Sequence, residues 1–292
     1  MNIKEFSEII KERLEERTGL EVRLAEVKKN NSVIFHGINI IVPETNILPT
    51  IYLESYLKDY ENGISLEDTT EAIVRKWERE REHTPVDMEW FKDFSQVRGK
   101  VAYRIVNFEA NREMLQEIPY IPFLNLAKVF YVALSSEEYG DGSILIQNRH
   151  MKFWGVSTEE LDEIASQNTP KLFQAEVIDL EDVVKEIMQS ESTEFEISEE
   201  DRMYVVTNRA RHYGAAVMCY PSIIKEFAEQ KECDLLIIPS SIHEVIILPY
   251  KKNQVYIKNM VKEVNATQVA PEEVLSDSVY VYQRETDSIT IA

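Results

Sequence analysis

Hydrophobic and polar positions at the start of the chain predict a helix followed by a hairpin. Apolar residues recur at helical spacing from Ile3 to Leu14, which predicts an amphipathic helix over residues 2–17. Residues 21–42 then alternate between hydrophobic and polar positions on both sides of Asn30-Asn31. Because asparagine tolerates positive φ, this alternation predicts a β-hairpin that turns at the two asparagines.

The rest of the chain mixes expected helices with expected strands. Ser65 is expected to cap a helix that starts at residue 66, with Asp68 three residues later. Adjacent strands mixed with helices, without strict alternation, predict an α+β fold with mainly antiparallel sheets and packed helices. Further strands are expected at 100–109, 127–136, 143–147, 202–208, 214–221, 234–241, 243–249 and 277–284, and further helices at 111–117, 147–155, 157–165, 180–188, 221–230 and 257–264.

A proline-rich segment is the best candidate for a domain boundary. The chain has 292 residues, which favours one large domain or two closely associated lobes. Two prolines stand close together in "IPYIPFLNLA", residues 118–127. We therefore expect an N-terminal lobe over residues 1–118 and a C-terminal lobe over residues 119–292, with one continuous domain as the alternative.

The charge of the chain bears on its partners. Hydrophobic residues make up 44% of the chain. The formal net charge is −20, and this negative charge argues against direct binding to a nucleic-acid backbone. Residues 176–201 contain eleven acidic residues and one lysine. One interpretation is an acidic docking surface or nucleic-acid mimic. The other is a solvated helix face followed by a loop.

Several features point to a cytoplasmic protein without cofactor. The N-terminal segment has charges throughout and lacks the apolar region of a signal peptide, and the aliphatic runs are too short for a membrane span. Cys219 and Cys233 lie far apart in sequence and have no histidine partner at metal-ligand spacing. We expect both to be ordinary core residues in a reducing compartment, with no cofactor and no contact with a membrane.

The segment "PSSIHEVIILP", residues 239–249, raises the question of catalysis. His243-Glu244 begins like the helix of a zinc protease, but the fourth residue after His243 is Ile247 and the segment favours a strand. The five histidines show no ligand spacing, so no metal site is expected. Both faces of the expected strand are aliphatic, which predicts a central strand.

A serine and a histidine could still form a site at the entrance of this strand. Strand alternation sends His243 and Glu244 to opposite faces, whereas Ser241 would share the face of His243. Ser241 could then act as a nucleophile with His243 as its base, oriented by a carboxylate such as Asp277. In the alternative, Ser240 and Ser241 form a turn and bond to the local backbone.

Two other segments have both a structural and a functional interpretation. The loop from Asn265 to Ser278 is rich in hydrogen-bonding side chains and is either connecting structure or the lining of a ligand pocket. In the second case the ligand-binding candidates are Ser240, Glu244, Asn265 and Gln268. Residues 147–155 are expected to form a helix, or to bind an anionic ligand through Arg149, His150 and Trp154.

Several strings resemble a known bacterial family. "IPSSIHEVIILP", "VNATQVAPEEVLSDSVYVY", "NILPTIYLESYLKDYENG" and "IPYIPFLNLAKVFYVAL" are similar to domain of unknown function 5688, which is common in anaerobic gut bacteria. "SILIQNRHMKFWGVSTEELDEIASQNTPKLF" is also similar, so the resemblance covers nearly the whole chain. The resemblance implies a cytosolic bacterial protein and one continuous architecture. It assigns no activity, cofactor or catalytic residues to this chain.

Three functions follow as hypotheses. The first is a non-catalytic interaction or regulatory factor with a protein partner, because no motif specific for catalysis is present. The second is a hydrolase or small-ligand-binding enzyme that uses Ser241 and His243. The third is an acidic nucleic-acid mimic or docking protein that uses residues 176–201.

Overall fold

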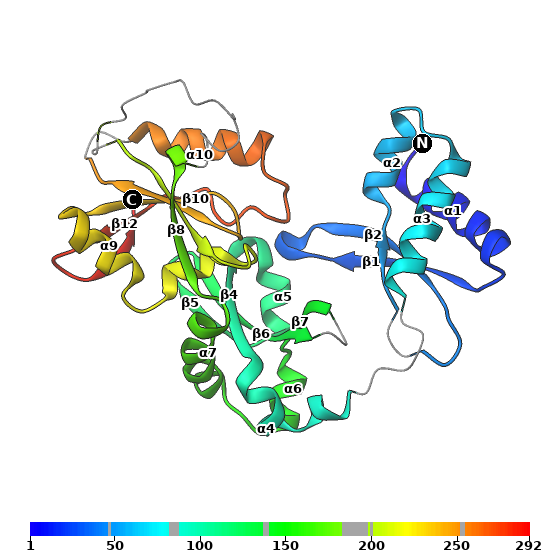
Figure 1. Ribbon diagram of the computed structural model, residues 1–292, viewed down its shortest axis with the longest axis horizontal. Helices are drawn as coiled ribbons and strands as arrows, with labels where there is room; N and C mark the ends of the chain where they lie inside the picture. The colour runs from blue at the N-terminus through cyan, green and yellow to red at the C-terminus, as the bar shows by residue number, and fades with distance from the viewer. Residues whose placement is uncertain (46–47, 82–87, 137–139, 183–197, 199–200, 252–254) are drawn as a thin grey trace. The chain divides into compact units, whose positions relative to one another are not determined.

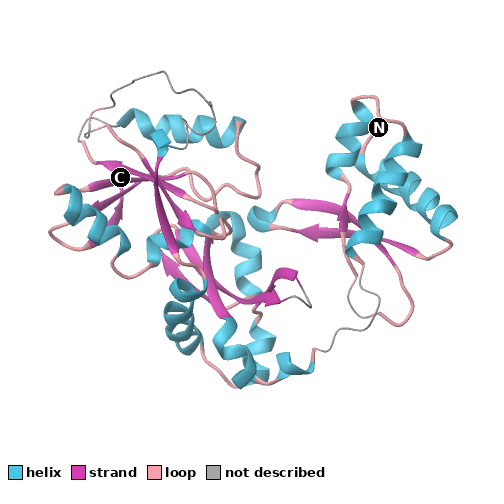
Figure 2. Ribbon diagram, in the orientation of Figure 1, coloured by secondary structure: helices cyan, strands magenta, loops and turns pink. Residues whose placement is uncertain are grey.

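The chain forms two compact units, Met1–Trp90 and Phe91–Ala292 (Figure 1). This computed structural model describes residues 1–45, 48–81, 88–136, 140–182, 198, 201–251 and 255–292. Helices pack against antiparallel sheets in both units, so the expected α+β class is confirmed (Figure 2).

The first unit begins with the expected helix and hairpin. Helix α1 (Ile3–Thr18) starts at a capping box formed by Asn2 and Glu5 and ends where Gly19 adopts a left-handed conformation. Strands β1 (Val22–Lys28) and β2 (Ile34–Ile40) pair in antiparallel register. The turn η1 (Asn30–Ser32) joins them, and Asn31 has φ 57° as its residue type allows.

Two further helices complete the core of this unit. The short strand β3 (Ile51–Tyr52) pairs with β2 and leads into α2 (Glu54–Glu61). Helix α3 (Leu66–Glu80) is capped as predicted, since the Ser65 side chain accepts a hydrogen bond from the Asp68 N–H at 3.1 Å. The buried core side chains come from α1, α3, the sheet and the residue that precedes α2, and include Phe6, Ile10, Leu14, Val22, Ile38, Ile40, Ile51, Leu53, Ile73 and Trp77.

The second unit opens with a four-stranded antiparallel sheet. Short helical segments η2 (Glu89–Lys92), α4 (Phe94–Val97) and η3 (Arg98–Lys100) precede β4 (Val101–Asn107), and η4 (Glu109–Asn111) with α5 (Arg112–Glu117) follows it. The long strand β6 (Leu126–Ser136) pairs with β4 on one side and with β5 (Tyr120–Phe123) and β7 (Gly140–Leu145) on the other. The pairing of β4 with β6 thus joins residues from both sides of position 118 in one sheet.

The outer edge of β5 carries a proline. The Ile146 N–H donates to the Phe130 carbonyl oxygen at 3.0 Å, so even-numbered residues of β6 direct their backbone groups toward β7 and β5. Ile121, opposite Lys128, therefore bonds to β6, and the next residue faces away from it. Pro122 thus stands at the free edge, where its missing N–H removes no hydrogen bond of the sheet.

Helix α7 supports the first strand of this sheet. Helix α6 (Asn148–Trp154) confirms the helix expected at residues 147–155, and α7 (Thr158–Leu172) follows with Ser157 as its N-cap. The Thr169 hydroxyl accepts a hydrogen bond from the Tyr103 N–H at 3.0 Å, and the Asn168 side chain donates to the Val101 carbonyl oxygen at 3.0 Å. These two neighbouring side chains attach β4 to the helix.

The second sheet of this unit has six antiparallel strands in the order β13-β12-β10-β11-β9-β8. Helix α10 (Val255–Thr267) packs Ile257 and Val261 onto one face of this sheet. Strand β11 lies in the interior of the sheet, as its two aliphatic faces predict. The strands are β8 (Ala175–Asp179), β9 (Tyr204–Asn208), β10 (Leu235–Pro239), β11 (Val245–Pro249), β12 (Tyr280–Gln283) and β13 (Ser288–Ile291).

Some elements differ from those expected from the sequence, and one expected helix is not tested. Residues 214–221 were expected as a strand, but the 3-10 helix η5 (Gly214–Cys219) is formed there, because Tyr213 turns the chain at φ 53°. Helix α9 (Ile223–Lys231) follows as predicted, whereas strand β13 was not expected from the sequence. The helix expected at residues 180–188 lies largely outside the described residues.

Candidate functional site

The turn between β10 and β11 contains the serine and the histidine of the sequence hypothesis. The Ser241 N–H donates to the Glu244 carbonyl oxygen at 3.2 Å, and the His243 N–H donates to the Ser241 hydroxyl oxygen at 3.0 Å. Residues 241–244 therefore form a tight turn, and the extended conformation of β11 does not reach back to Ser241. The Ser240 hydroxyl donates to the Glu244 carboxylate at 3.3 Å, within the same turn.

The His243 side chain is held by neighbouring loops. The Tyr213 N–H donates to Nδ1 of the ring at 3.3 Å, and Nε2 lies 3.6 Å from a carboxylate oxygen of Glu273. The Thr207 hydroxyl on β9 donates to the His243 carbonyl oxygen at 2.8 Å. His243 therefore connects β9, the loop that follows β9 and the loop that precedes β12.

Aromatic and cationic side chains gather beside this histidine. The His243 ring stacks on Tyr213 with centroids 5.9 Å apart, and the His212 ring centroid lies 5.4 Å from that of His243. The Arg104 guanidinium lies over the Tyr213 ring at 4.3 Å, and the Tyr131 ring centroid is 5.7 Å from that of Tyr213. We name this group the His243 cluster; its members are Arg104, Tyr131, His212, Tyr213, His243 and Glu273.

Close backbone packing fixes the loop that carries His212 and Tyr213. A Cβ atom on Gly214 would lie under 3.0 Å from the Thr207 hydroxyl and the His243 carbonyl oxygen. Both atoms of the buried Asn208 side chain amide bond to the backbone of His212, at 2.8 and 3.3 Å. The loop is thus held at the His212 backbone, by hydrogen bonds, and at Gly214, by close packing.

The environment of the cluster changes the pKa of its exposed histidine. Partial burial, followed by the charges of His243 and Arg104, lowers the pKa of His212 below its ordinary value. Burial also raises the pKa of Tyr131 well above the usual range of tyrosine. Both groups are therefore uncharged at neutral pH.

The other candidates from the loop at 265–278 lie apart from His243 or serve local structure. Asn265 is buried and donates to the Ser276 carbonyl oxygen at 3.0 Å and to the Asp277 carboxylate at 2.9 Å. Asp277 thus pairs with Asn265, and the carboxylate beside His243 is that of Glu273. Gln268 is exposed, and its N–H continues the helical hydrogen bonds of α10.

Sequence reasoning found His243 but missed most of the cluster around it. Arg104 is a single cation in the apolar strand segment "VAYRIV", and this is a signal that could have been used. His212 and Tyr213 stand before Gly214 in a polar loop, another usable signal. That these loops meet depends on strand pairing between distant segments, which one sequence does not specify.

Two pockets of the second unit lie apart from the His243 cluster. A pocket of about 610 Å³ is lined by β5, η5, α9 and β13, and His243 is not part of its lining. A smaller pocket of about 270 Å³ lies against α6 and includes Phe91, His150 and Trp154, with the Trp154 indole donating to the Phe91 carbonyl oxygen at 2.9 Å.

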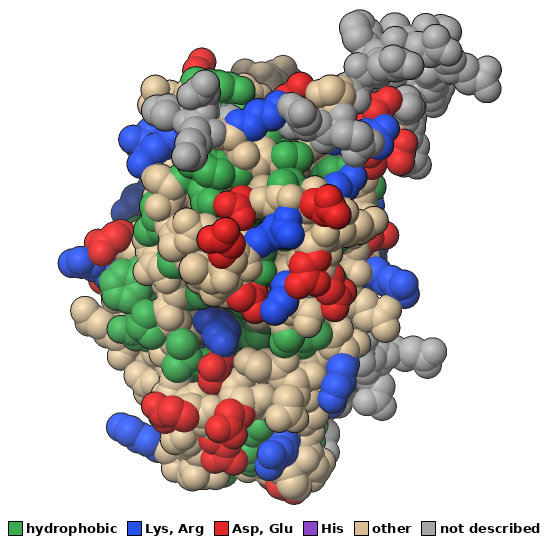
Figure 3. All heavy atoms as spheres, turned by 90° about the vertical axis from the view of Figure 1, so that its left-hand side faces the viewer, with side chains coloured by type: hydrophobic (Ala, Val, Ile, Leu, Met, Phe, Trp, Pro, Cys, Tyr) green, Lys and Arg blue, Asp and Glu red, His purple; other side chains and the backbone are tan. Residues whose placement is uncertain are grey.

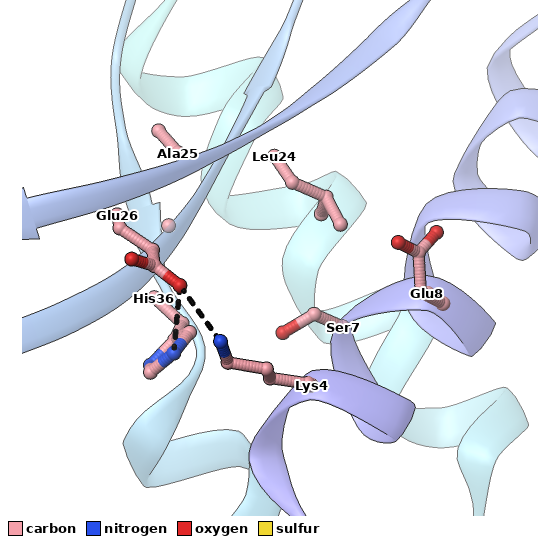
Figure 4. A pocket seen from close by; sticks show the side chains of 8 residues that line it. Lys4, Ser7, Glu8, Leu24, Ala25, Glu26 and His36 are labelled. Carbon is pink, nitrogen blue, oxygen red and sulfur yellow. Dashed lines mark ion pairs between the residues drawn. The ribbon is translucent and has the colours of Figure 1, made fainter.

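The first unit has a pocket of about 180 Å³ between α1 and the hairpin. Figure 4 shows the Glu26 carboxylate between Lys4 and His36, at 3.2 Å from the lysine Nζ and 3.8 Å from Nε2 of the histidine. The other ring nitrogen of His36 lies 3.2 Å from a carboxylate oxygen of Glu54. These polar contacts connect α1, the hairpin and α2, which is a structural role.

Neither a cluster of metal ligands nor a membrane-spanning helix is found in the described part of the chain. Within the described residues, no group of three or more potential ligands is arranged to hold a metal ion. Among the helices described, none has the length and apolarity to span a bilayer. Cys219 and Cys233 are both free thiols.

The acidic segment 176–201 is only partly described. Residues 183–197 and 199–200 lie outside the described residues, and residues 176–179 belong to β8. On the face of the molecule in Figure 3, lysine and arginine side chains lie among aspartate and glutamate side chains.

Comparison with known proteins identifies a family without a described activity. A family model described as "Family of unknown function (DUF5688)" matches residues 3–284, which confirms the resemblance seen in the sequence. No curated protein and no solved structure matches the chain.

Proposed function

Because this chain belongs to the DUF5688 family, whose function is unknown, we propose a function from its own geometry: a non-catalytic interaction or regulatory factor that binds its ligand at the His243 cluster. One observation carries the proposal. The Tyr213 N–H occupies the lone pair on Nδ1 of His243, so the neutral ring holds its proton on Nε2, the nitrogen that faces Glu273.

A general base needs a nitrogen lone pair directed at the nucleophile. In the neutral His243 ring, the single lone pair is already used by the Tyr213 N–H. The Ser241 oxygen accepts a hydrogen bond from the backbone N–H of His243, as serines in tight turns commonly do. This geometry supports a role for His243 in holding loops together and disfavours a hydrolase that uses Ser241.

The remaining features support a protein that acts by binding in the cytoplasm. Two free thiols are typical of a reducing compartment. The net charge of −20 disfavours direct contact with nucleic acid, which leaves a protein or a small molecule as the partner. We also propose that the protein is bacterial and that it acts in the cytoplasm.

A fluorophosphonate probe tests the absence of catalysis without knowledge of a substrate. Such probes modify serines that a neighbouring base activates, so Ser241 should remain unmodified when peptides of the treated protein are analysed by mass spectrometry. A known serine hydrolase in the same tube serves as the positive control. Modification of Ser241 that disappears in His243→Asn would contradict the proposal.

A further inference from the structure

Arg104 carries a positive charge that no described carboxylate neutralises. Its Nε atom is buried and has no hydrogen-bond partner in the described part of the protein. No ion pair joins Arg104 to a described carboxylate. Buried charges are normally paired, so an anion that binds the accessible Nη atoms would supply the counter-charge that the guanidinium lacks, although the enclosed Nε stays out of its reach.

The outer side of the same guanidinium is open. Nε is buried, whereas the two Nη atoms are not among the buried atoms without a partner. Neither Nη atom bonds to a described protein group, so both are accessible to a ligand. The guanidinium is oriented by its contact with the Tyr213 ring at 4.3 Å. Two parallel N–H groups in fixed orientation are the arrangement that binds two oxygens of one anion.

Tyr131 adds a hydroxyl next to this group. Arg104 lies opposite Val129 and Ala102 lies opposite Tyr131, so both long side chains stand on the same face of the sheet. Tyr131 is only 3% exposed, but its hydroxyl oxygen is in contact with solvent. This hydroxyl bonds to no described group. A nearly buried side chain with an open polar end is suited to contact a ligand.

His212 supplies a third polar group from the facing loop. Its ring centroid lies 3.8 Å from that of Tyr213, and neither ring nitrogen bonds to a described group. Asn208, itself 2% exposed, holds the His212 backbone through both ends of its side chain amide. His212 therefore occupies a built position, although its side chain is exposed.

We propose that Arg104, Tyr131 and His212 bind a tetrahedral oxyanion, namely the phosphate group of a small molecule. The proposal rests on the non-catalytic function proposed above, because it takes the cluster as a binding site. A phosphate dianion can accept hydrogen bonds from the arginine, the hydroxyl and a protonated imidazole together. A carboxylate has one charge and two oxygens, which the arginine alone would satisfy.

Sulfate is the first probe, because it keeps two charges at every pH used. The imidazole resonances of the full-length protein are followed by NMR between pH 5 and 8, with and without sulfate. Sulfate should raise the pKa of His212, because a bound dianion stabilises the protonated ring against the charges of Arg104 and His243. By linkage, sulfate should bind more tightly as the pH falls through that pKa.

Variants separate a built site from surface charge. Arg104→Gln should weaken sulfate binding about tenfold or more. Arg104→Lys should weaken it too, because a lysine lacks the two parallel N–H groups of the guanidinium. Tyr131→Phe should weaken binding by about threefold to tenfold. The control is Arg112→Gln, an exposed arginine paired with Glu109, which should bind like the wild type. If Arg104→Gln fails to fold, His212→Gln at an exposed position should abolish the pH dependence of binding.

Two further probes identify the source of the phosphate. Inorganic phosphate and glycerol 2-phosphate are compared with acetate at equal concentrations. Tighter binding of either phosphate than of acetate supports the inference; the ester binding more tightly assigns a phosphate monoester, and inorganic phosphate binding more tightly assigns the free ion. Equal binding of acetate would overturn the inference, as would a His212 resonance that ignores sulfate.

The two proposals fail in different experiments. Probe modification at Ser241 together with sulfate binding would keep the anion site and remove the non-catalytic function. An unmodified Ser241 without sulfate binding would keep the non-catalytic function and overturn the anion site.

Discussion

Gly214 is the residue on which the geometry of the His243 cluster depends most directly. Its backbone runs so close to β9 and to the His243 carbonyl that a side chain has no space. His212 and Tyr213 directly precede Gly214 in the sequence. A change at this position would therefore move the cluster as well as the local backbone.

We predict that Gly214→Ala lowers the free energy of unfolding by roughly 2–3 kcal/mol, because the added methyl group must displace Thr207 or the His243 backbone. Urea denaturation followed by circular dichroism measures this change. Gly99→Ala is the matched control, since a Cβ there meets nothing within 4 Å. A loss of stability in the control equal to that in Gly214→Ala would refute the explanation.

Two histidines predict how stability depends on pH. Burial lowers the pKa of His150, with Arg149 as a second cause, and lowers the pKa of His212 together with His243 and Arg104. Protonation is therefore harder in the folded state than in the unfolded state. The unfolded state binds more protons as the pH falls below about 6.5, so the folded protein loses stability between about pH 7 and pH 5.

The double variant His150→Gln/His212→Gln should lose less stability than the wild type over this pH range. Urea denaturation at pH 7.5 and at pH 5.5 gives the comparison. The carboxylates with lowered pKa, such as Asp93 and Asp287, do not interfere, because their contribution is lost only at lower pH. An equal fall in both proteins would show that these histidines are not responsible.

At the scale of elements, α7 stabilises the second unit through one threonine. Thr169 is 1% exposed, and its hydroxyl accepts from the Tyr103 N–H and donates to the Ala165 carbonyl oxygen. Thr169→Val keeps the shape but leaves the buried N–H without an acceptor. We expect a loss of about 1–3 kcal/mol in the free energy of unfolding.

Thr267→Val is the matched control for this prediction. Thr267 also donates to a helical carbonyl four residues earlier, at 2.8 Å, but it is exposed. Its replacement should change stability by less than about 0.5 kcal/mol. Thermal denaturation of the two variants side by side provides the measurement, and equal effects would argue against a special role of the Tyr103 contact.

Local patterns predicted most elements, whereas contacts between distant loops were not predictable. The helix from Ile3 and the cap at Ser65 follow from short-range rules of spacing and capping. The segment after Tyr213 has the composition of a strand, but the positive φ of that residue redirects the chain into η5. Glu273 reaches His243 only because the sheet order brings the two loops together. The register between distant strands cannot be predicted from either segment alone.

At the scale of the whole molecule, the two units predict where the chain can be divided. The first unit has its own core of buried side chains from α1, α3 and the hairpin. A fragment of residues 1–90 should therefore fold, with dispersed NMR signals. A fragment of residues 1–118 carries β4 without its partner β6 and should be less soluble.

Size-exclusion chromatography and NMR of the two fragments test this division. A folded, monomeric fragment 1–118 together with an unfolded fragment 1–90 would instead support a boundary near the two prolines.

Pro122 has a consequence for how the chain behaves at high concentration. Apart from Pro119 and Pro122, the segment from Ile118 to Phe123 is apolar and uncharged, and without prolines such a composition would favour self-templated fibrils when the strand is exposed. With no N–H at its outward position, the strand cannot pass a complete hydrogen-bond ladder to a second molecule. The pyrrolidine ring of Pro122 thus acts as a gatekeeper against fibril growth from this edge.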